Sequence, residues 1–338
     1  MANSLVTGGA GFMGSHAAAH LIRLGHRVVV LDDLSGGFTE NIPTGATFVE
    51  GSILDTKLLE RLFTEHRFDY VYHLAAYAAE GLSHFIKRFN YTNNLIGSVN
   101  LINASVNHGV KCFVFTSSIA VYGAGQAPMT EEMSPLPEDS YGIAKLAVER
   151  ELQVSHDMFG LDYIIFRPHN VYGERQNIGD RYRNVVGIFM NQLLQGEPMT
   201  IFGDGQQKRA FTHIDDVAPI IAEAVSVPPA RKQVFNIGAD ESFTVNQLAE
   251  IVAEAMGLPC RVKYLPPRNE VFIAFSDHEK AYRTFQRRPS ISLEAGIESM
   301  AAWVKVNGAR QSSPFSDIEI MKNMPPSWRP AADGSNTE

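Results

Sequence analysis

The sequence predicts an α/β fold: a doubly wound parallel sheet of the Rossmann type with a smaller C-terminal domain. Seven short apolar segments follow one another, most of them separated by stretches long enough for a helix. Strands that are apolar on both faces form parallel sheets, which helices cover on each side. A glycine-rich turn directly after the first segment is the second observation, because nucleotide-binding sheets of this type carry such a turn there.

The predicted strands run from the N-terminus to beyond the middle of the chain. They comprise residues 4–6, 27–32, 47–50, 69–74, 111–117, 162–167 and 234–237. Helices are predicted at residues 15–24, 93–108 and 141–159, and Asp215 and Asp216 are expected to cap a further helix that runs to Ala224. Ligands of such sheets bind beyond the carboxyl ends of the strands. We therefore expect the catalytic centre at that edge, where residues 73–76, 116–118 and 167–170 lie.

The first strand leads into a turn whose glycines have the spacing GxxGxxG, at Gly8, Gly11 and Gly14. In such a turn, backbone N–H groups and the helix N-terminus face a pyrophosphate. The second strand ends at Asp32, at about the spacing expected for a carboxylate that binds the adenosine ribose hydroxyls. Asp32 would repel a 2′-phosphate, and residues 33–37 contain no Arg or Lys to bind one. The sequence predicts NAD, and disfavours NADP.

A tyrosine and a lysine follow the strand that ends in Ser117 and Ser118. Tyr141 and Lys145 are four positions apart on a predicted helix, so they share one face of it. The reference pKa of tyrosine is about 10, so a tyrosine needs a nearby cation to act as a base at neutral pH. We expect Lys145 to stabilise the tyrosinate form of Tyr141. The alternative is an exposed pair on a surface helix, because short motifs also occur by chance.

Together these motifs resemble those of the extended short-chain dehydrogenase/reductase family, and within it the NAD-dependent nucleotide-sugar epimerase/dehydratase group. The resemblance extends from Leu5 to about Trp303 and is strongest to UDP-glucose and UDP-glucuronate 4-epimerases. Seven motifs carry it in the expected order: TGGAGFMG (7–14), HLAA (73–76), NLIG (94–97), TSSIAVYG (116–123), YGIAK (141–145), RPHN (167–170) and GDG (203–205).

The resemblance implies a role for each matching residue. Ser118 would hydrogen-bond the sugar hydroxyl, Tyr141 would be the acid/base, and Lys145 would bind the nicotinamide ribose and lower the pKa of Tyr141. Asn94 would support the site from the neighbouring helix. The implied cofactor-binding residues are Gly8, Gly11, Phe12, Met13, Gly14, Asp32, Ile53, Leu74, Ala75, Ala76, Asn94, Tyr141 and Lys145. The implied substrate-binding residues are Ser118, Asn170, Arg209, Arg268 and Glu270, and no metal is expected.

The residues before Tyr122 separate the branches of the family. Members that eliminate water or carbon dioxide resemble this chain but place an acid two or three residues before this tyrosine, and the 3,5-epimerases place a cysteine at Ala120. This chain has Ile119 and Ala120 there. We therefore expect 4-epimerisation of a UDP-hexose or UDP-hexuronate through a transient 4-keto intermediate. A dehydratase or reductase with an oxidised product and a non-enzymatic NAD-binding sensor are the alternatives.

Some residues concern the identity of the sugar. Ala274 is small enough to admit an N-acetyl group at sugar C2. In the charged segment 173–183, Arg181 or Arg183 pairs with a uronate carboxylate, or the segment is a solvated loop. Glu80 follows the strand that usually leads to the sugar pocket, and it either lines that pocket or faces water. The pair Arg268 and Glu270 is one residue closer than in the family, so an exposed ion pair is its alternative.

Length suggests about two domains. We expect an NAD-binding domain at residues 1–171, to which 210–240 return, a nucleotide-sugar-binding domain at 172–209 and 241–308, and a flexible tail or packing arm at 309–338.

The net charge of −8 disfavours nucleic-acid partners. The two cysteines lack metal spacing, so reduced thiols are expected. Without a membrane-length apolar stretch or a targeting segment, we expect a cytoplasmic protein with no membrane partner. The resemblance implies a homodimer through the helices at 93–108 and 141–159.

Overall fold

The computed structural model of the protein describes residues 1–124, 127–268, 272–310, 315 and 317–329. Within this part of the chain, the largest sheet has seven parallel strands in the order β11-β6-β5-β4-β1-β2-β3. They are β1 (Asn3–Thr7), β2 (Arg27–Asp32), β3 (Thr47–Glu50), β4 (Tyr70–His73), β5 (Cys112–Thr116), β6 (Tyr163–Pro168) and β11 (Gln233–Ile237). All seven predicted strands are confirmed. The strand order reverses between β1 and β4, where sheets of this type bind their ligands.

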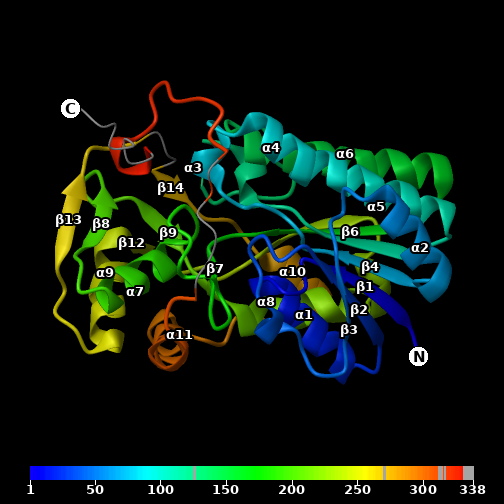
Figure 1. Cartoon of the computed structure of the whole chain (residues 1–338), viewed down its shortest axis with the longest axis horizontal. Coiled ribbons are helices and arrows are strands. Elements are labelled where there is room, and N and C mark those ends of the chain that lie inside the picture. Colours follow the sequence, from blue (N-terminus) through cyan, green and yellow to red (C-terminus); the bar gives the residue numbers. More distant parts are fainter. Residues whose placement is uncertain (125–126, 269–271, 311–314, 316, 330–338) are drawn as a thin grey trace, which may run out of the picture.

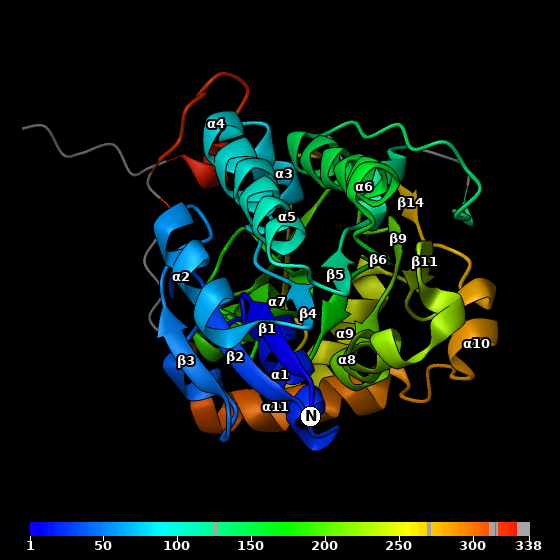
Figure 2. The same cartoon turned by 90° about the vertical axis from the view of Figure 1, so that its right-hand side faces the viewer.

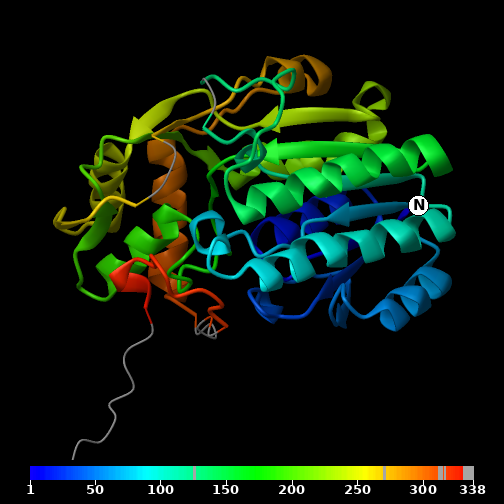
Figure 3. The same ribbon diagram turned by 90° about the horizontal axis from the view of Figure 1, so that it is seen from above.

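Helices cover both faces of this sheet, as predicted (Figures 1 and 2). One face packs against α1 (Phe12–Arg23), α8 (Ile214–Glu223) and α10 (Glu279–Phe285). The other packs against α2 (Thr56–His66), α5 (Gly97–Asn107) and α6 (Ser140–Phe159). Seen from above, α5 and α6 lie side by side on the same face (Figure 3). The sheet is apolar on both sides because each side is a separate hydrophobic core.

A second group of elements lies beside the carboxyl ends of the large sheet. Its helices are α7 (Val185–Leu194), α9 (Val245–Met256) and α11 (Leu293–Asn307), which share a core with β8 (Met199–Phe202). Its other short strands are β7 (Val171–Tyr172), β9 (Lys208–Ala210), β10 (Thr212–His213), β12 (Ser242–Thr244), β13 (Val262–Leu265) and β14 (Ile273–Ala274). The chain leaves the large sheet after β6 and returns to it at β11. None of the helices in the described residues could cross a membrane.

The ends of two helices show how local sequence sets their bounds. Helix α6 begins because the Asp139 carboxylate accepts a hydrogen bond from the Gly142 N–H at 2.8 Å, and it ends at Gly160, whose φ of 77° is left-handed. Helix α8 corrects a prediction. Its N-cap is His213, whose ring accepts from the N–H of Asp215, while Asp215 and Asp216 lie inside the first turn. There they stabilise the helix through its dipole rather than as caps.

A short segment beyond α11 packs against the large sheet's own loops. Trp328 is buried and joins a cluster with Leu82 and Ile86, next to α3 (Glu80–Ser83) and α4 (Lys87–Tyr91). The sequence predicts a tail that is either flexible or a packing arm. Residues 317–329 form a packing arm.

A buried ion pair ties α6 to the sheet. The Arg167 guanidinium on β6 donates to both carboxylate oxygens of Glu149 on α6, at 2.9 and 2.5 Å, and neither side chain is more than 4% exposed. The same carboxylate accepts from the Ser117 hydroxyl, and Arg167 also donates to the Tyr122 hydroxyl at 2.7 Å. A buried pair that is fully hydrogen-bonded fixes one geometry, and the loss of one partner leaves the other charge uncompensated.

We expect Glu149→Gln to lower the free energy of unfolding by about 3–5 kcal/mol, because it leaves Arg167 buried without a counter-charge. Urea unfolding followed by circular dichroism measures this change. The matched control is Glu279→Gln, which breaks exposed pairs with Arg283 and Arg288 and should cost less than about 1 kcal/mol. Equal effects of the two variants would contradict this account.

Candidate active site

A large cavity opens at the carboxyl ends of β1, β2, β4, β5 and β6 and extends to β8 and β9. Its volume is about 1420 Å³, whereas pockets for one small ligand are about 300–1,000 Å³. The glycine turn lines one part of the cavity, and Arg209 and Arg268 line another. The cavity therefore has room for a dinucleotide and a second nucleotide at once.

The glycine turn forms a cradle that no larger side chain would fit. A Cβ at Gly14 would overlap the carbonyl oxygen of Gly8, and one at Gly8 would lie 2.6 Å from the backbone N of Ala75. Gly8 also has a left-handed φ of 69°. No side chain caps α1 at Gly11, so the helix N-terminus is directed at the cavity. This arrangement fits a pyrophosphate.

Asp32 lies at the end of β2 beside this turn. Its carboxylate accepts hydrogen bonds from the N–H groups of Ala10 at 3.0 Å and Leu34 at 2.8 Å. Burial raises its pKa, and these two hydrogen bonds offset part of that effect. Asp32 lines the cavity, as do the predicted Gly8, Gly11, Phe12, Met13, Gly14, Ile53, Leu74, Ala75 and Ala76. The residues present thus fit the adenosine and pyrophosphate of a dinucleotide.

Asn94 does not line the cavity, which corrects its assignment as a direct cofactor contact. It is 1% exposed, on the π-helical turn Thr92–Ile96 that leads into α5. Its amide accepts from the N–H of Tyr77 at 2.9 Å and donates to the carbonyl of Tyr77 at 3.1 Å and to Asn90. Asn94 therefore holds the cavity wall from behind. This agrees with a supporting role from the neighbouring helix.

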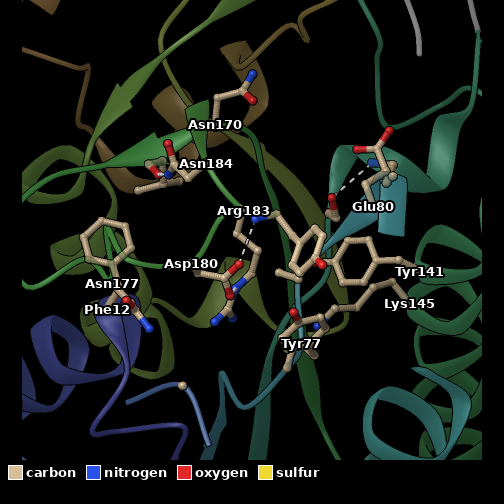
Figure 4. A pocket seen from close by; sticks show the side chains of 18 of the residues that line it. Phe12, Tyr77, Glu80, Tyr141, Lys145, Asn170, Asn177, Asp180, Arg183 and Asn184 are labelled. Atoms are coloured by element: carbon tan, nitrogen blue, oxygen red, sulfur yellow. Dashed lines mark hydrogen bonds and ion pairs between the residues drawn. The ribbon is translucent and has the colours of Figure 1, made fainter. Parts of the chain in front are cut away.

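Ser118, Tyr141 and Lys145 meet where β5 ends against α6, and all three line the cavity (Figure 4). The Ser118 hydroxyl accepts from the N–H of Ala120 at 3.1 Å and is close enough to the Tyr141 phenol to oppose the rise in its pKa. The Lys145 ammonium donates to the carbonyl of Thr116 at 2.8 Å and lies 5.7 Å from the centre of the Tyr141 ring. Tyr141 is 7% exposed and Lys145 2%. The alternative of an exposed surface pair is therefore wrong.

Burial governs the protonation of this cluster. It raises the pKa of Tyr141, and the Ser118 hydroxyl offsets part of the increase. It also lowers the pKa of Lys145 to about 7, although the Glu149 carboxylate opposes this change. The implied lowering of the Tyr141 pKa by Lys145 is not seen in this structure. Bound NAD would add the positive charge of the nicotinamide ring near this cluster, which favours the phenolate.

The other part of the cavity holds the predicted phosphate ligands. The Arg209 guanidinium donates hydrogen bonds to the carbonyl oxygens of Lys208 at 2.8 Å and Phe272 at 2.9 Å. The Arg268 guanidinium lies over the rings of Phe202 and Trp328, and Asn170 donates to the carbonyl of Ala210 at 3.0 Å with a left-handed φ of 40°. All three predicted residues line the cavity. Glu270 lies outside the described residues.

The charged segment between β7 and α7 lies over the cofactor part of the cavity. Arg183 donates to Asp180 at 2.7 Å, and its guanidinium lies 4.7 Å from the centre of the Tyr77 ring. A Cβ at Gly36, next to Asp32, would meet the Arg183 guanidinium at 2.9 Å. Figure 4 shows the pair between Tyr77 and Phe12. The segment is not a solvated loop, and Arg183 is already paired.

Sequence reasoning left several cavity residues without a role. Asp180, Tyr77 and Phe202 line the cavity. Phe202 directly precedes the GDG motif, so its position beside a family motif could have marked it as a cavity residue. Glu80 lines the cavity and is also exposed, so both of its alternatives hold in part.

The fold and the cluster of Ser118 with the buried Tyr141 and Lys145 define a short-chain dehydrogenase/reductase. Residues 4–238 match the family described as NAD dependent epimerase/dehydratase family. The UDP-glucose 4-epimerase of Mycolicibacterium smegmatis is 35% identical, over 87% of this chain and 96% of that protein. The chain therefore belongs to the NAD-dependent epimerase/dehydratase family, and its cofactor is NAD.

Solved structures agree with this assignment. The UDP-glucose 4-epimerase from Thermotoga maritima, determined with UDP-glucose, is 39% identical with a TM-score of 0.86, covering 90% of this chain and 99% of that one. The UDP-glucuronic acid 4-epimerase from Bacillus cereus, in complex with UDP-glucuronic acid and NAD, is 29% identical with a TM-score of 0.82 and the same two coverages. The predicted family, fold class and cofactor are confirmed.

Because burial lowers the pKa of Lys145, its burial reduces the free energy of unfolding by an amount that depends on pH. Between pH 7 and 10.5 the unfolded chain binds the Lys145 proton more than the folded chain does, so the free energy of unfolding rises with pH. Lys145→Met removes this dependence. We expect the stability advantage of Lys145→Met over the native protein to fall from pH 7 to 10, by at most about 1.4 kcal/mol per pH unit.

Thermal unfolding of the NAD-stripped proteins across this pH range measures the difference. Lys57→Met, which removes an exposed lysine from α2, is the control for the loss of one charge. A stability difference between Lys145→Met and the native protein that rises with pH would contradict the lowered pKa of the buried Lys145.

Proposed function

We propose that this protein is an NAD-dependent UDP-sugar 4-epimerase, an isomerase that acts through a transient 4-keto sugar. The observation that carries the proposal is that one cavity is lined by the glycine cradle, by Ser118, Tyr141 and Lys145, and by Arg209 and Arg268. A hydroxyl held there by its nucleotide diphosphate meets a proton acceptor and a nicotinamide together. The 4-epimerases among its relatives support this assignment.

The chain's own groups supply the proton transfer and the binding. Tyr141 takes the proton of the C4 hydroxyl, directly or through the neighbouring Ser118 hydroxyl. Lys145 stabilises the resulting charge from the same helix face. NAD, when bound, supplies the reversible hydride acceptor. The Arg side chains hold the diphosphate, so the sugar can turn and present its opposite face. The reaction has no net redox change, so the cofactor stays bound between turnovers.

The wall beside Ser118 supports epimerisation over elimination. Ile119 and Ala120 line the cavity in the short 3-10 helix Ile119–Tyr122. Neither side chain transfers protons, so these two positions supply no acid or base for the carbons next to C4. The dehydratase alternative would need one. The buried catalytic cluster equally argues against a non-enzymatic sensor.

The charges in the cavity favour a neutral hexose over a uronic acid. The Arg181 guanidinium donates to the carbonyl of Trp328 at 3.0 Å, and Arg183 is paired with Asp180. Burial raises the pKa of Tyr141, and the carboxylates of Asp139 and Glu80, which line the cavity, add to this rise and would disfavour a third carboxylate there. Ala274 is a small cavity residue, which leaves space for an N-acetyl group.

The test of this function is incubation of the protein, without added cofactor, with UDP-glucose, UDP-N-acetylglucosamine and UDP-glucuronate. We expect C4 epimers by chromatography, with kcat/KM for UDP-glucose at least about tenfold above that for UDP-glucuronate. Glu80→Gln should narrow this ratio. A 4-keto product, net NADH formation, or faster turnover of the uronate would contradict the respective part of the proposal.

Tyr141→Phe removes the proton acceptor but keeps the ring. We expect turnover to fall by about 10²–10⁴-fold, while the NAD content and the fold stay unchanged. Chromatography of the products measures turnover, and the absorbance of released cofactor measures the NAD content. Tyr264→Phe, a matched change at an exposed tyrosine, should leave the rate unchanged. Normal turnover by Tyr141→Phe would overturn the mechanism.

We also propose a homodimer formed through α5 and α6. The outer face of α6 exposes Ile143, Val154, Met158 and Phe159, which are 43–69% exposed, and Ile96 is exposed beside α5. Such an apolar face is typical of an interface between copies. Light scattering should give twice the chain mass, and a monomer would contradict the proposal. The predicted domain division also stands as a proposal, and the cytoplasmic location stays a prediction.

A further inference from the structure

The segment that follows α11 reaches the active-site cavity. We call Phe315 and residues 317–329 the C-terminal arm. It lies beyond Trp303, where the family resemblance ends, and the relatives' structures match about nine-tenths of this chain. Phe315, Ile318 and Trp328 of the arm line the same cavity as Tyr141 and Arg268. The arm therefore reaches the site from beyond the part of the chain that carries the family motifs.

Backbone and charged groups fix the arm at both ends. The Glu319 carboxylate accepts from the N–H groups of Arg88 and Phe89, each at 2.8 Å. The carbonyl of Phe85 accepts from the N–H groups of Glu319 and Ile320 at 2.9 and 3.1 Å. Near the other end, Arg181 donates to the carbonyl of Trp328. The arm therefore has one defined path across the cavity rim.

The Trp328 ring is built into the wall of the cavity. It is 6% exposed and makes edge contacts with Phe85, Tyr182 and Phe202, with ring centres 5.4–6.4 Å apart. A Cβ at Gly81 would lie 3.1 Å from the ring. A plug that leaves when substrate enters would have to break all these contacts. The packing indicates a fixed wall.

The surroundings of Trp328 suit a nucleoside diphosphate. The Arg268 guanidinium lies 4.5 Å from the centre of the Phe202 ring and 5.6 Å from that of Trp328. The half-buried Phe202 ring can stack on a planar nucleobase, and the Arg268 guanidinium beside it can bind phosphate. Phe202 and Trp328 come from β8 and from the arm, so neither segment alone makes this arrangement.

We propose that Trp328 is a substrate-binding residue that forms the outer wall of the nucleotide part of the cavity, where a nucleoside diphosphate binds beside Phe202 and Arg268. The inference rests on the proposed function for the identity of the substrate. It assigns the arm to affinity for the nucleotide and not to the chemical step, because Tyr141 and Lys145 lie on α6 and make no ring contact with Trp328 among the described residues.

The test compares Trp328→Ala, Trp328→Phe and the control Met321→Ala, an exposed position of the same arm. Calorimetry of the holoenzyme with UDP gives the Kd, and epimerisation of the UDP-sugar gives KM and kcat. We expect Trp328→Ala to raise both Kd and KM about tenfold, with kcat and NAD content changed less than twofold. Trp328→Phe should recover most of the affinity, and Met321→Ala should match the native protein.

A fluorescence measurement keeps the proposal testable if Trp328→Ala does not fold. The chain has two tryptophans, so Trp303→Phe leaves Trp328 as the sole indole, and its emission should change on addition of UDP. Unchanged emission, or unchanged Kd and KM in a folded Trp328→Ala, would overturn the proposal. Tighter UDP binding by that variant would also overturn it, because the arm would then be an inhibitory plug.

Binding of UDP does not depend on turnover, which separates the two proposals. A protein without epimerase activity whose Kd for UDP depends on Trp328 would retain the arm's role and overturn the proposed function. An active epimerase whose Kd and KM do not change when Trp328 is replaced would support the proposed function and overturn the role of the arm.

Discussion

One carboxylate makes the catalytic cluster possible. Tyr141, Lys145 and Glu149 occupy one face of α6 at intervals of four residues, so the helix carries a phenol, an ammonium and a carboxylate in line. Glu149 neutralises the buried Arg167, accepts from Ser117 next to the catalytic Ser118, and supports the charge of Lys145. Without it, two cations would be buried against the ends of β5 and β6 at a cost that the local packing does not offset.

The parts of the structure that depend on local pattern were predictable from the sequence. Continuous apolar runs located all seven strands of the large sheet, and the glycine spacing located the cradle before α1. The cofactor acid Asp32 and the cluster around Tyr141 followed from position relative to strand ends. These features are determined within a few residues of the chain, where steric and hydrogen-bonding rules act directly.

The remaining features depend on contacts between distant segments. Asn94 is directed at the backbone of Tyr77 and not at the cavity, which only the packing of the π-helical turn decides. The segment that carries Arg183 lies over Gly36, more than a hundred residues away in the sequence. Likewise, no periodicity in the tail predicts that Trp328 would reach Phe202. Long-range contacts of this kind leave no local signal.

The order of strands in the large sheet has a consequence for synthesis on the ribosome. Strand β6 receives its outer neighbour β11 only after the elements from β7 to α8 have been made. At about 5–20 residues per second, the edge of β6 stays unpaired for several seconds on the nascent chain. An open strand edge invites pairing with other chains. During translation this edge is therefore the site at which a chaperone would protect the protein.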